Sequence, residues 1–135
     1  MSSVIGIDPG REKCGVAVVD KQNGVLCRKV IDTKNLVKIV KIFVKEYKTK
    51  IIIIGNGTTS KDAQKKIVDS FLAKEIELIC VDEYRTTDLA KIRYWQENPP
   101  CGWRKIIPTS MQVPLVPVDD YVAVILAERY LTKNS

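Results

Sequence analysis

The chain has 135 residues, of which 45% are hydrophobic and 28% charged, a composition typical of a globular protein with one buried core. It contains no histidine, which excludes a Ser-His-Asp triad, a Cys-His pair and every metal site that needs a histidine ligand. The net charge of +6 is compatible with a polyanionic partner, and no apolar run approaches the ~20 residues that span a bilayer.

The cysteines and the N-terminus indicate the expected compartment. Cys14, Cys27, Cys80 and Cys101 lie far apart with no C-x-x-C pair, so we expect buried free thiols and no zinc site. The first residues lack the charged and apolar segments of a secretory signal. We therefore expect a cytoplasmic protein that does not contact a membrane.

Apolar periodicity and turn residues predict one domain over residues 1–135. In chain order, the pattern predicts strands at 3–8, 14–20 and 25–31, a helix at 36–47, a strand at 51–55, a helix at 60–74, a strand at 78–81, a helix at 86–95, a proline-rich surface loop at 98–117 and a helix at 119–131. In the 60–74 helix, Thr59 or Ser60 is the expected cap, and Val68 and Leu72 are expected to face inward with their apolar neighbours. Helical crossovers make strands one, four and five parallel. The fold class is therefore α/β, a five-stranded mixed sheet with helices on both faces.

Acidic residues stand at positions that this fold would gather together. Asp8 ends the first strand, Asp82 and Glu83 follow the fifth, and Asp119 and Asp120 begin the last helix. Each has an ordinary explanation: an Asp-Pro-Gly turn, a solvated strand end, or a helix N-cap. Ligands of open α/β sheets, however, bind beyond the carboxyl ends of parallel strands, and carboxylates suit Mg²⁺ or Mn²⁺. We interpret the three positions together as a metal site.

The stretches IGIDPGREKCGVAVVD, VDEYRTT and VDDYVAVILAERYL resemble the YqgF family, in the RuvC-like branch of the ribonuclease H superfamily. Members are described as Holliday junction resolvases or nucleases of precursor 16S ribosomal RNA. The resemblance covers nearly the whole chain and implies a ribonuclease H-like fold. It also implies a metal-dependent endonuclease that hydrolyses phosphodiester bonds in structured nucleic acid, with Mg²⁺ or Mn²⁺ held by Asp8, Glu83 and Asp119.

The chain departs from the family pattern in three places. Tyr84 follows Glu83, which moves the arginine to Arg85. RuvC carries a second aspartate one helical turn after the first, where this chain has Val122. Asp120 points about 100° away around the helix, so it is an imperfect substitute as a metal ligand. The loop GNGTTS at 55–60 is more similar to the related domain of the transcription accessory protein Tex, which is described as binding rather than cutting.

These departures leave an alternative open, a catalytically silent module that binds nucleic acid. A sugar-kinase or actin-like ATPase ranks well below it, because that class normally needs two such domains around its nucleotide. The expected partner is RNA or branched DNA, and the chain is expected to be a monomer or a weak homodimer, since paired cuts across a junction call for symmetry. The residues expected to contact nucleic acid are Arg11, Lys13, Asn56, Gly57, Thr58, Lys61 and Arg85.

Overall fold

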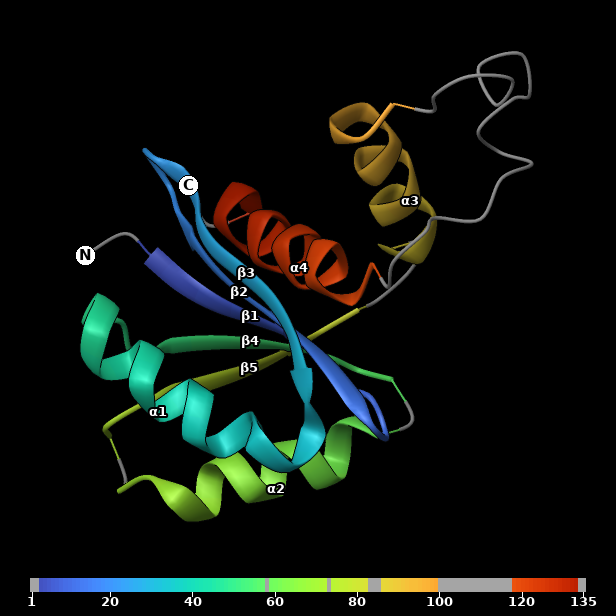
Figure 1. The fold of residues 1–135 in the computed structure, drawn as a ribbon. Coiled ribbons are helices and arrows are strands. Elements are labelled where there is room, and N and C mark those ends of the chain that lie inside the picture. The colour runs from blue at the N-terminus through green and yellow to red at the C-terminus, as the bar shows by residue number, and fades with distance from the viewer. Residues whose placement is uncertain (1–2, 58, 73, 83–85, 100–117, 134–135) are drawn as a thin grey trace.

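A computed structural model describes residues 3–57, 59–72, 74–82, 86–99 and 118–133 (Figure 1). Each predicted strand and helix is present in these ranges. The elements are β1 (Ser3–Asp8), β2 (Lys13–Asp20), β3 (Gly24–Asp32), a short 3-10 turn (Thr33–Asn35), α1 (Leu36–Tyr47), β4 (Ile51–Gly55), α2 (Ser60–Ser70), β5 (Glu77–Val81), α3 (Thr86–Glu97) and α4 (Asp119–Lys133). Most of the predicted proline-rich loop, residues 100–117, lies outside the described residues.

The strands form one mixed sheet in the order β3-β2-β1-β4-β5. β1 pairs antiparallel with β2 and parallel with β4, and β4 pairs parallel with β5. The register places Asp8 opposite Gly15 and Gly55 opposite Val81. The carboxyl ends of β1, β4 and β5 therefore meet at one edge of the sheet, and α4 begins on the same side (Figure 1). The predicted five-stranded mixed sheet is confirmed, and β4 lies between β1 and β5.

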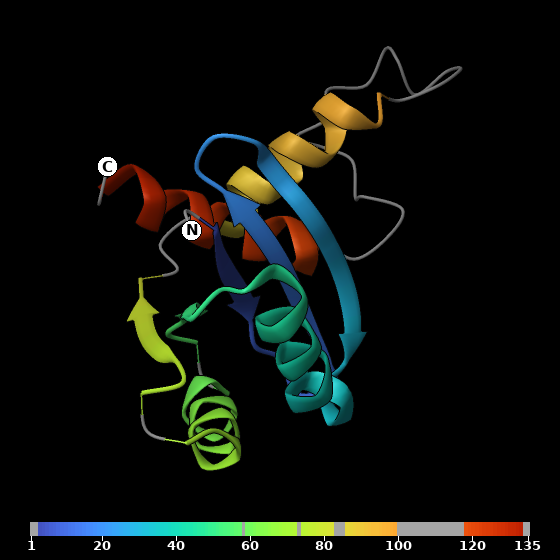
Figure 2. The ribbon, with the colours of Figure 1, turned by 90° about the vertical axis from the view of Figure 1, so that its left-hand side faces the viewer.

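Helices cover both faces of the sheet, as predicted. Figure 1 shows α4 on one side and α1 and α2 on the other, and the turned view in Figure 2 keeps this separation. Ile5 and Ile7 of β1 belong to the core under α1 and α2, whereas Val4 belongs to the core under α3 and α4. This alternation follows from the two-residue period of a strand. None of the described helices is both long and apolar enough to cross a membrane.

The helix predicted at 60–74 is shorter than expected, and two of the residues predicted to face inward are exposed. α2 ends at Ser70, because Phe71 adopts an extended backbone with ψ 152°. Val68 and Leu72 are 54% and 76% exposed, while Ile67 is fully buried. An apolar side chain next to a buried one is turned about 100° around a helix, which takes Val68 off the packed face.

The cysteine prediction holds for one residue and fails for another. Cys14 is buried in β2, as expected, and its neighbours are the Thr33 hydroxyl and the Gly10 carbonyl. Cys80 is exposed because it lies on β5, an edge strand of the sheet. Cys27 is intermediate, and Cys101 lies outside the described residues.

α4 lies unusually close to the sheet. A Cβ atom added at Gly6 of β1 would stand 2.2 Å from the carbonyl oxygen of Ala123 and 3.1 Å from the Ala127 side chain. Every residue of α4 from Asp120 to Ala127 is buried. The absence of a side chain at Gly6 therefore sets how deeply the middle of α4 packs.

Gly6→Ala is expected to lower the free energy of unfolding by about 1–3 kcal/mol, because the new methyl group meets backbone that can yield only by shifting the helix. Urea denaturation followed by circular dichroism measures this loss. Lys21→Ala, at the exposed turn after β2, is the control and should change stability by less than about 0.5 kcal/mol. Equal stability of the Gly6 variant and the control would contradict the close packing of α4 on β1.

Candidate active site

Two of the three predicted acidic positions meet in the structure. Asp8 is the last residue of β1 and Asp119 is the first of α4, and a side-chain hydrogen bond joins their carboxyl groups. Both side chains are partly buried. Two carboxyl groups can share a hydrogen bond only when one of them carries a proton. Once both are ionised, the pair concentrates negative charge at this edge of the sheet.

Gly15 makes this meeting possible. It lies opposite Asp8 in the register of β1 and β2, and the backbone of Asp119 rests directly on it. A Cβ atom at Gly15 would stand 1.9 Å from the carbonyl oxygen of Asp119, far inside van der Waals contact. Only glycine allows this approach, so Gly15 brings the start of α4 within reach of the end of β1.

The surroundings of Asp119 resist its ionisation. Burial raises the pKa of the Asp119 carboxyl above its ordinary value, and the negative charge of Asp120 raises it further. The hydrogen bond with Asp8 acts in the opposite direction. A carboxyl group held in this way gains most from a nearby positive charge, because a cation favours its ionised form.

Asp120 has a different set of contacts from Asp119. Its Oδ2 accepts a hydrogen bond of 2.8 Å from Nη1 of Arg28, and its Oδ1 accepts one of 2.9 Å from the Tyr121 backbone N–H. Partial burial by itself lowers the pKa of Arg28, but the hydrogen bond to Asp120 and nearby negative charges outweigh it, so the pKa is raised. Both oxygens of Asp120 thus have donors, and the pair of Asp8 and Asp119 does not include it. Val122, where the family resemblance led us to look for a further aspartate, is 3% exposed in the apolar core.

Two threonine hydroxyls hold the turn after Asp8 by hydrogen bonds to its backbone carbonyls. The Thr59 hydroxyl donates to the Pro9 carbonyl at 3.1 Å, and the Thr33 hydroxyl donates to the Gly10 carbonyl at 2.8 Å. Thr59 is the N-cap residue of α2, one of the two predicted, but its side chain makes no capping hydrogen bond. Thr33 was missed altogether, because no local pattern in the sequence tells which carbonyl a strand-end threonine will reach.

The predicted nucleic-acid contacts lie around this edge. Arg11, Lys13 and Lys61 are exposed, and Lys13 Nζ pairs with Asp32 Oδ1 at 2.7 Å. The hydrogen bond between them raises the pKa of Lys13 and lowers that of Asp32. A shallow groove of about 350 Å³ runs beside this ion pair and is lined also by Asn35 and Lys38.

Three of the predicted nucleic-acid contacts, Asn56, Gly57 and Thr58, belong to the loop after β4. Asn56 is exposed and Gly57 is partly buried. The Ser60 backbone N–H donates to the Gly57 carbonyl at 3.0 Å, so it is used within the loop and is not directed at a ligand. Thr58, Glu83 and Arg85 lie outside the described residues.

The donor atoms at this edge suit a hard cation. Within the described ranges, no group of three or more His, Cys, Asp or Glu side chains is arranged to hold a metal. Asp8 and Asp119 nevertheless form an oxygen-only pair, and Mg²⁺ is commonly held by one or two carboxylates together with waters and substrate phosphates. Glu83 follows the strand β5, which ends at the same edge of the sheet. The residues present therefore fit Mg²⁺ or Mn²⁺.

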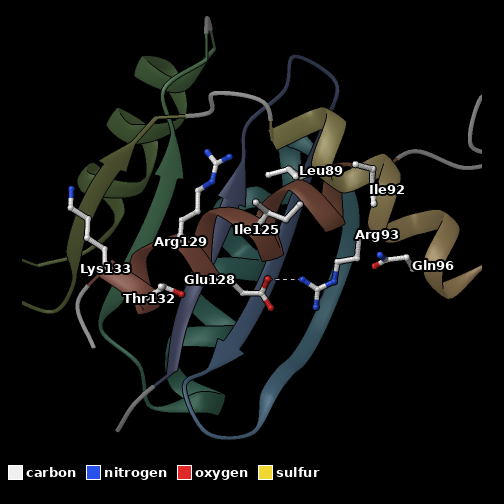
Figure 3. A pocket seen from close by; sticks show the side chains of 9 residues that line it. All are labelled: Leu89, Ile92, Arg93, Gln96, Ile125, Glu128, Arg129, Thr132 and Lys133. Atoms are coloured by element: carbon white, nitrogen blue, oxygen red, sulfur yellow. Dashed lines mark hydrogen bonds and ion pairs between the residues drawn. The ribbon is translucent and has the colours of Figure 1, made fainter. Parts of the chain in front are cut away.

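A groove of about 540 Å³ lies elsewhere, between α3 and α4 (Figure 3). Exposed Leu89 and Ile92 of α3 line one side of it, and an ion pair between Arg93 and Glu128 crosses it. It contains neither Asp8 nor Asp119. Pocket size therefore does not identify the site, and the carboxylate chemistry does.

Sequence comparison connects the chain with one family. Residues 2–88, from β1 to the start of α3, match the family described as the Tex protein YqgF-like domain. Over 75 residues the chain is 32% identical to protein tex of Bordetella pertussis, covering 50% of this chain and 10% of that protein. The chain thus spans about a tenth of the length of this curated relative.

Structure comparison extends the similarity to the whole chain. RuvC of T. thermophilus, in complex with a Holliday junction substrate, superposes with a TM-score of 0.64 at 12% identity, covering 99% of this chain and 96% of that chain. The resolvase of Fowlpox virus, in complex with substrate Holliday junction DNA, gives 0.59 at 17% identity and covers 98% of both chains. These likenesses show the fold, and they confirm the predicted ribonuclease H-like architecture.

Asp119→Asn is expected to stabilise the metal-free protein at neutral pH. The raised pKa of Asp119 means that its contribution to stability is complete below the ordinary carboxyl pKa of about 3.9 and is lost as the pH rises through the raised value. An amide avoids that loss. Urea denaturation in EDTA should show a gain at pH 7 that disappears near pH 3.

Asp62→Asn is the matched control, since Asp62 also lies in the first turn of a helix but is exposed. Its carboxylate suits the positive end of that helix, so neutralising it should give no gain. If Asp119→Asn were no more stable than the wild type at pH 7, the burial of this carboxyl would not strain the metal-free fold.

Proposed function

The chain belongs to the family of the Tex protein YqgF-like domain, and on that premise we propose that it is a metal-dependent endonuclease acting on structured nucleic acid. The observation that carries the proposal is the hydrogen-bonded pair of carboxyl groups of Asp8 and Asp119 at the carboxyl end of β1. Its position agrees with the rule that ligands of such sheets bind beyond the strand ends. The resolvase fold supports the same class of activity, because the similar structures hold Holliday junction DNA.

Asp8, Asp119 and Glu83 would hold the Mg²⁺ or Mn²⁺. When bound, such ions supply an activated water and stabilise the charge that develops on a phosphodiester under attack. Asp8 would be the shared ligand, since it ends the strand in the middle of the sheet. Thr33 and Thr59 would keep it in place by fastening the turn that follows it. Gly15 would keep Asp119 within reach.

The nucleic acid would approach over the basic rim of the same edge. Arg11, in the turn after β1, and Lys61, in the first turn of α2, offer exposed positive charge, and Lys38 lies beside the groove at the end of β3. Phosphates on RNA or branched DNA would be bound by this charge, without reading of sequence. Tyr94 and Trp95 are buried in the core, so base stacking is not assigned to them.

A second function is favoured by one observation, which is the composition of the first turn of α4. Val122 is buried where RuvC carries an aspartate, and Asp120 is bound to Arg28. A site with one metal ligand fewer would retain nucleic-acid binding and lose cutting. A silent binding module, as described for Tex, is therefore the alternative.

Asp8→Asn is expected to lower the cleavage rate by more than about 100-fold, because it removes a metal ligand directly and even residues that only support ligands contribute up to about that much. Cleavage is measured on labelled four-way DNA junctions and on precursor ribosomal RNA fragments, with Mg²⁺, Mn²⁺ or EDTA. The fold and the binding of nucleic acid should be retained.

Asp62→Asn serves as the control for this assay and should cut like the wild type, because Asp62 is exposed on α2. Cutting by the Asp8 variant at the wild-type rate would contradict the assignment. If wild type and variant both bind and neither cuts with any metal, the binding module replaces the nuclease.

Lys61→Ala is expected to weaken binding of every nucleic acid tested by a similar factor. It should also reduce the slope of log affinity against log salt by about 1, as the loss of one phosphate contact requires. Fluorescence anisotropy at several salt concentrations measures both quantities. Lys21→Ala, at the opposite edge of the sheet, should change neither, and equal behaviour of the two variants would remove Lys61 from the interface.

A further inference from the structure

We propose that Arg28 is a positioning residue for the carboxylate pair. By holding Asp120, it fixes the first turn of α4, where Asp119 meets Asp8. The inference rests on the proposed metal site. It assigns to Asp120 a structural role in place of metal binding.

One guanidinium contacts two consecutive residues of α4. Arg28 lies on β3, opposite Ala17 of β2, and its Nη1 is 2.8 Å from Oδ2 of Asp120. The same guanidinium carbon lies 4.3 Å from the centre of the Tyr121 ring, a cation–π distance. A charged hydrogen bond and a stacked ring together fix the direction of the helix start better than either contact alone.

The ion pair is desolvated enough to matter. The Asp120 side chain is 10% exposed and that of Arg28 is 38% exposed. Exposed ion pairs contribute little, whereas removing one partner of a buried pair leaves an uncompensated charge. Without Arg28, Asp120 would need to turn toward water, and the backbone of the first turn would have to move with it.

That movement would reach Asp119 directly. Asp119 precedes Asp120 in the chain, and its carbonyl rests on Gly15 with no room to spare. Neighbouring residues on a helix point about 100° apart, so one aspartate faces β1 while the next faces β3. The two aspartates therefore have different roles. Asp119 pairs with Asp8, and Asp120 anchors the first turn of α4 to β3 through Arg28.

The chain offers a matched control on the same helix. Arg93 of α3 pairs with Glu128 of α4 at 2.5 Å, about two turns beyond Asp120 (Figure 3). Both pairs join an arginine from a neighbouring element to an acid of α4. Arg93→Ala removes one of them without touching the first turn, so it separates general loosening of α4 from displacement of Asp119.

The test is the affinity of the full 135-residue chain for Mn²⁺, measured by calorimetry without nucleic acid. Arg28→Ala is expected to weaken binding about tenfold, the size seen when support of a metal ligand is lost. Asp120→Asn should have a similar effect, and the double variant should be no weaker than the weaker single one, because both changes break the same link. Arg93→Ala should bind like the wild type.

Hydrogen exchange at the backbone amides of Asp120, Tyr121 and Val122 gives a second readout that needs no metal. Arg28→Ala should speed it, and Arg93→Ala should not. If Arg28→Ala does not fold, Arg28→Lys replaces it, since lysine keeps the charge but loses the planar fork that both contacts use. An intermediate affinity is then expected.

Wild-type Mn²⁺ affinity in the Arg28 variant, or losses that add in the double variant, would overturn the positioning role while leaving the metal site intact. If the wild type itself binds no Mn²⁺, the proposed function fails instead. In that case, faster exchange at the start of α4 in Arg28→Ala alone would still establish that Arg28 fixes this turn, and unchanged exchange would overturn it.

Discussion

The arrangement of the whole site depends on how closely α4 approaches β1 and β2. At Gly6 and Gly15 the helix backbone occupies the space that a side chain would fill. The first contact sets the depth of the middle of α4, and the second places its first residue beside the end of β1. Because helix and strands are packed without a gap, a small shift of α4 would separate Asp119 from Asp8. The backbone packing of α4 on β1 and β2 therefore determines where the two carboxyl groups meet.

Two adjacent carboxylates experience this packing differently. Asp119 is pushed toward its protonated form by burial and by its neighbour, whereas Asp120 has an arginine and a backbone N–H to receive its charge. The fold therefore stabilises one negative charge and leaves the other in need of a counter-ion. A divalent cation would best stabilise the ionised carboxyl groups of Asp8 and Asp119, because carboxylate oxygens are the ligands that such a cation prefers. The electrostatics of α4 and the proposed metal site are in this sense one feature.

The similarity to known proteins differs between the first part of the chain and α4. The match to the Tex protein YqgF-like domain extends from β1 to the start of α3 and includes Asp8, whereas α4 and Asp119 lie beyond it. The fold shared with RuvC covers the chain almost completely. The chain thus has the fold of these resolvases, and its last helix carries a buried valine, Val122, two residues after the arginine-bound Asp120. The first turn of α4, which lies outside the matched family region, is therefore where the proposed nuclease and the proposed binding module would differ.

The sequence by itself determined the elements, the parallel arrangement of β1, β4 and β5, and the placement of Asp8 at a strand end. The elements and the position of Asp8 follow from apolar periodicity and from turn residues, which are local properties. The parallel arrangement follows from the helical crossovers between these strands. Only the tertiary structure decided that Arg28 meets Asp120 across 92 positions, that Thr33 and Thr59 hold the turn after Asp8, and that Val68 is exposed. Periodicity reports which side of an element is apolar. The partner of a polar side chain depends on which distant backbone or charge the packed helices bring within hydrogen-bonding distance, and no local pattern encodes that.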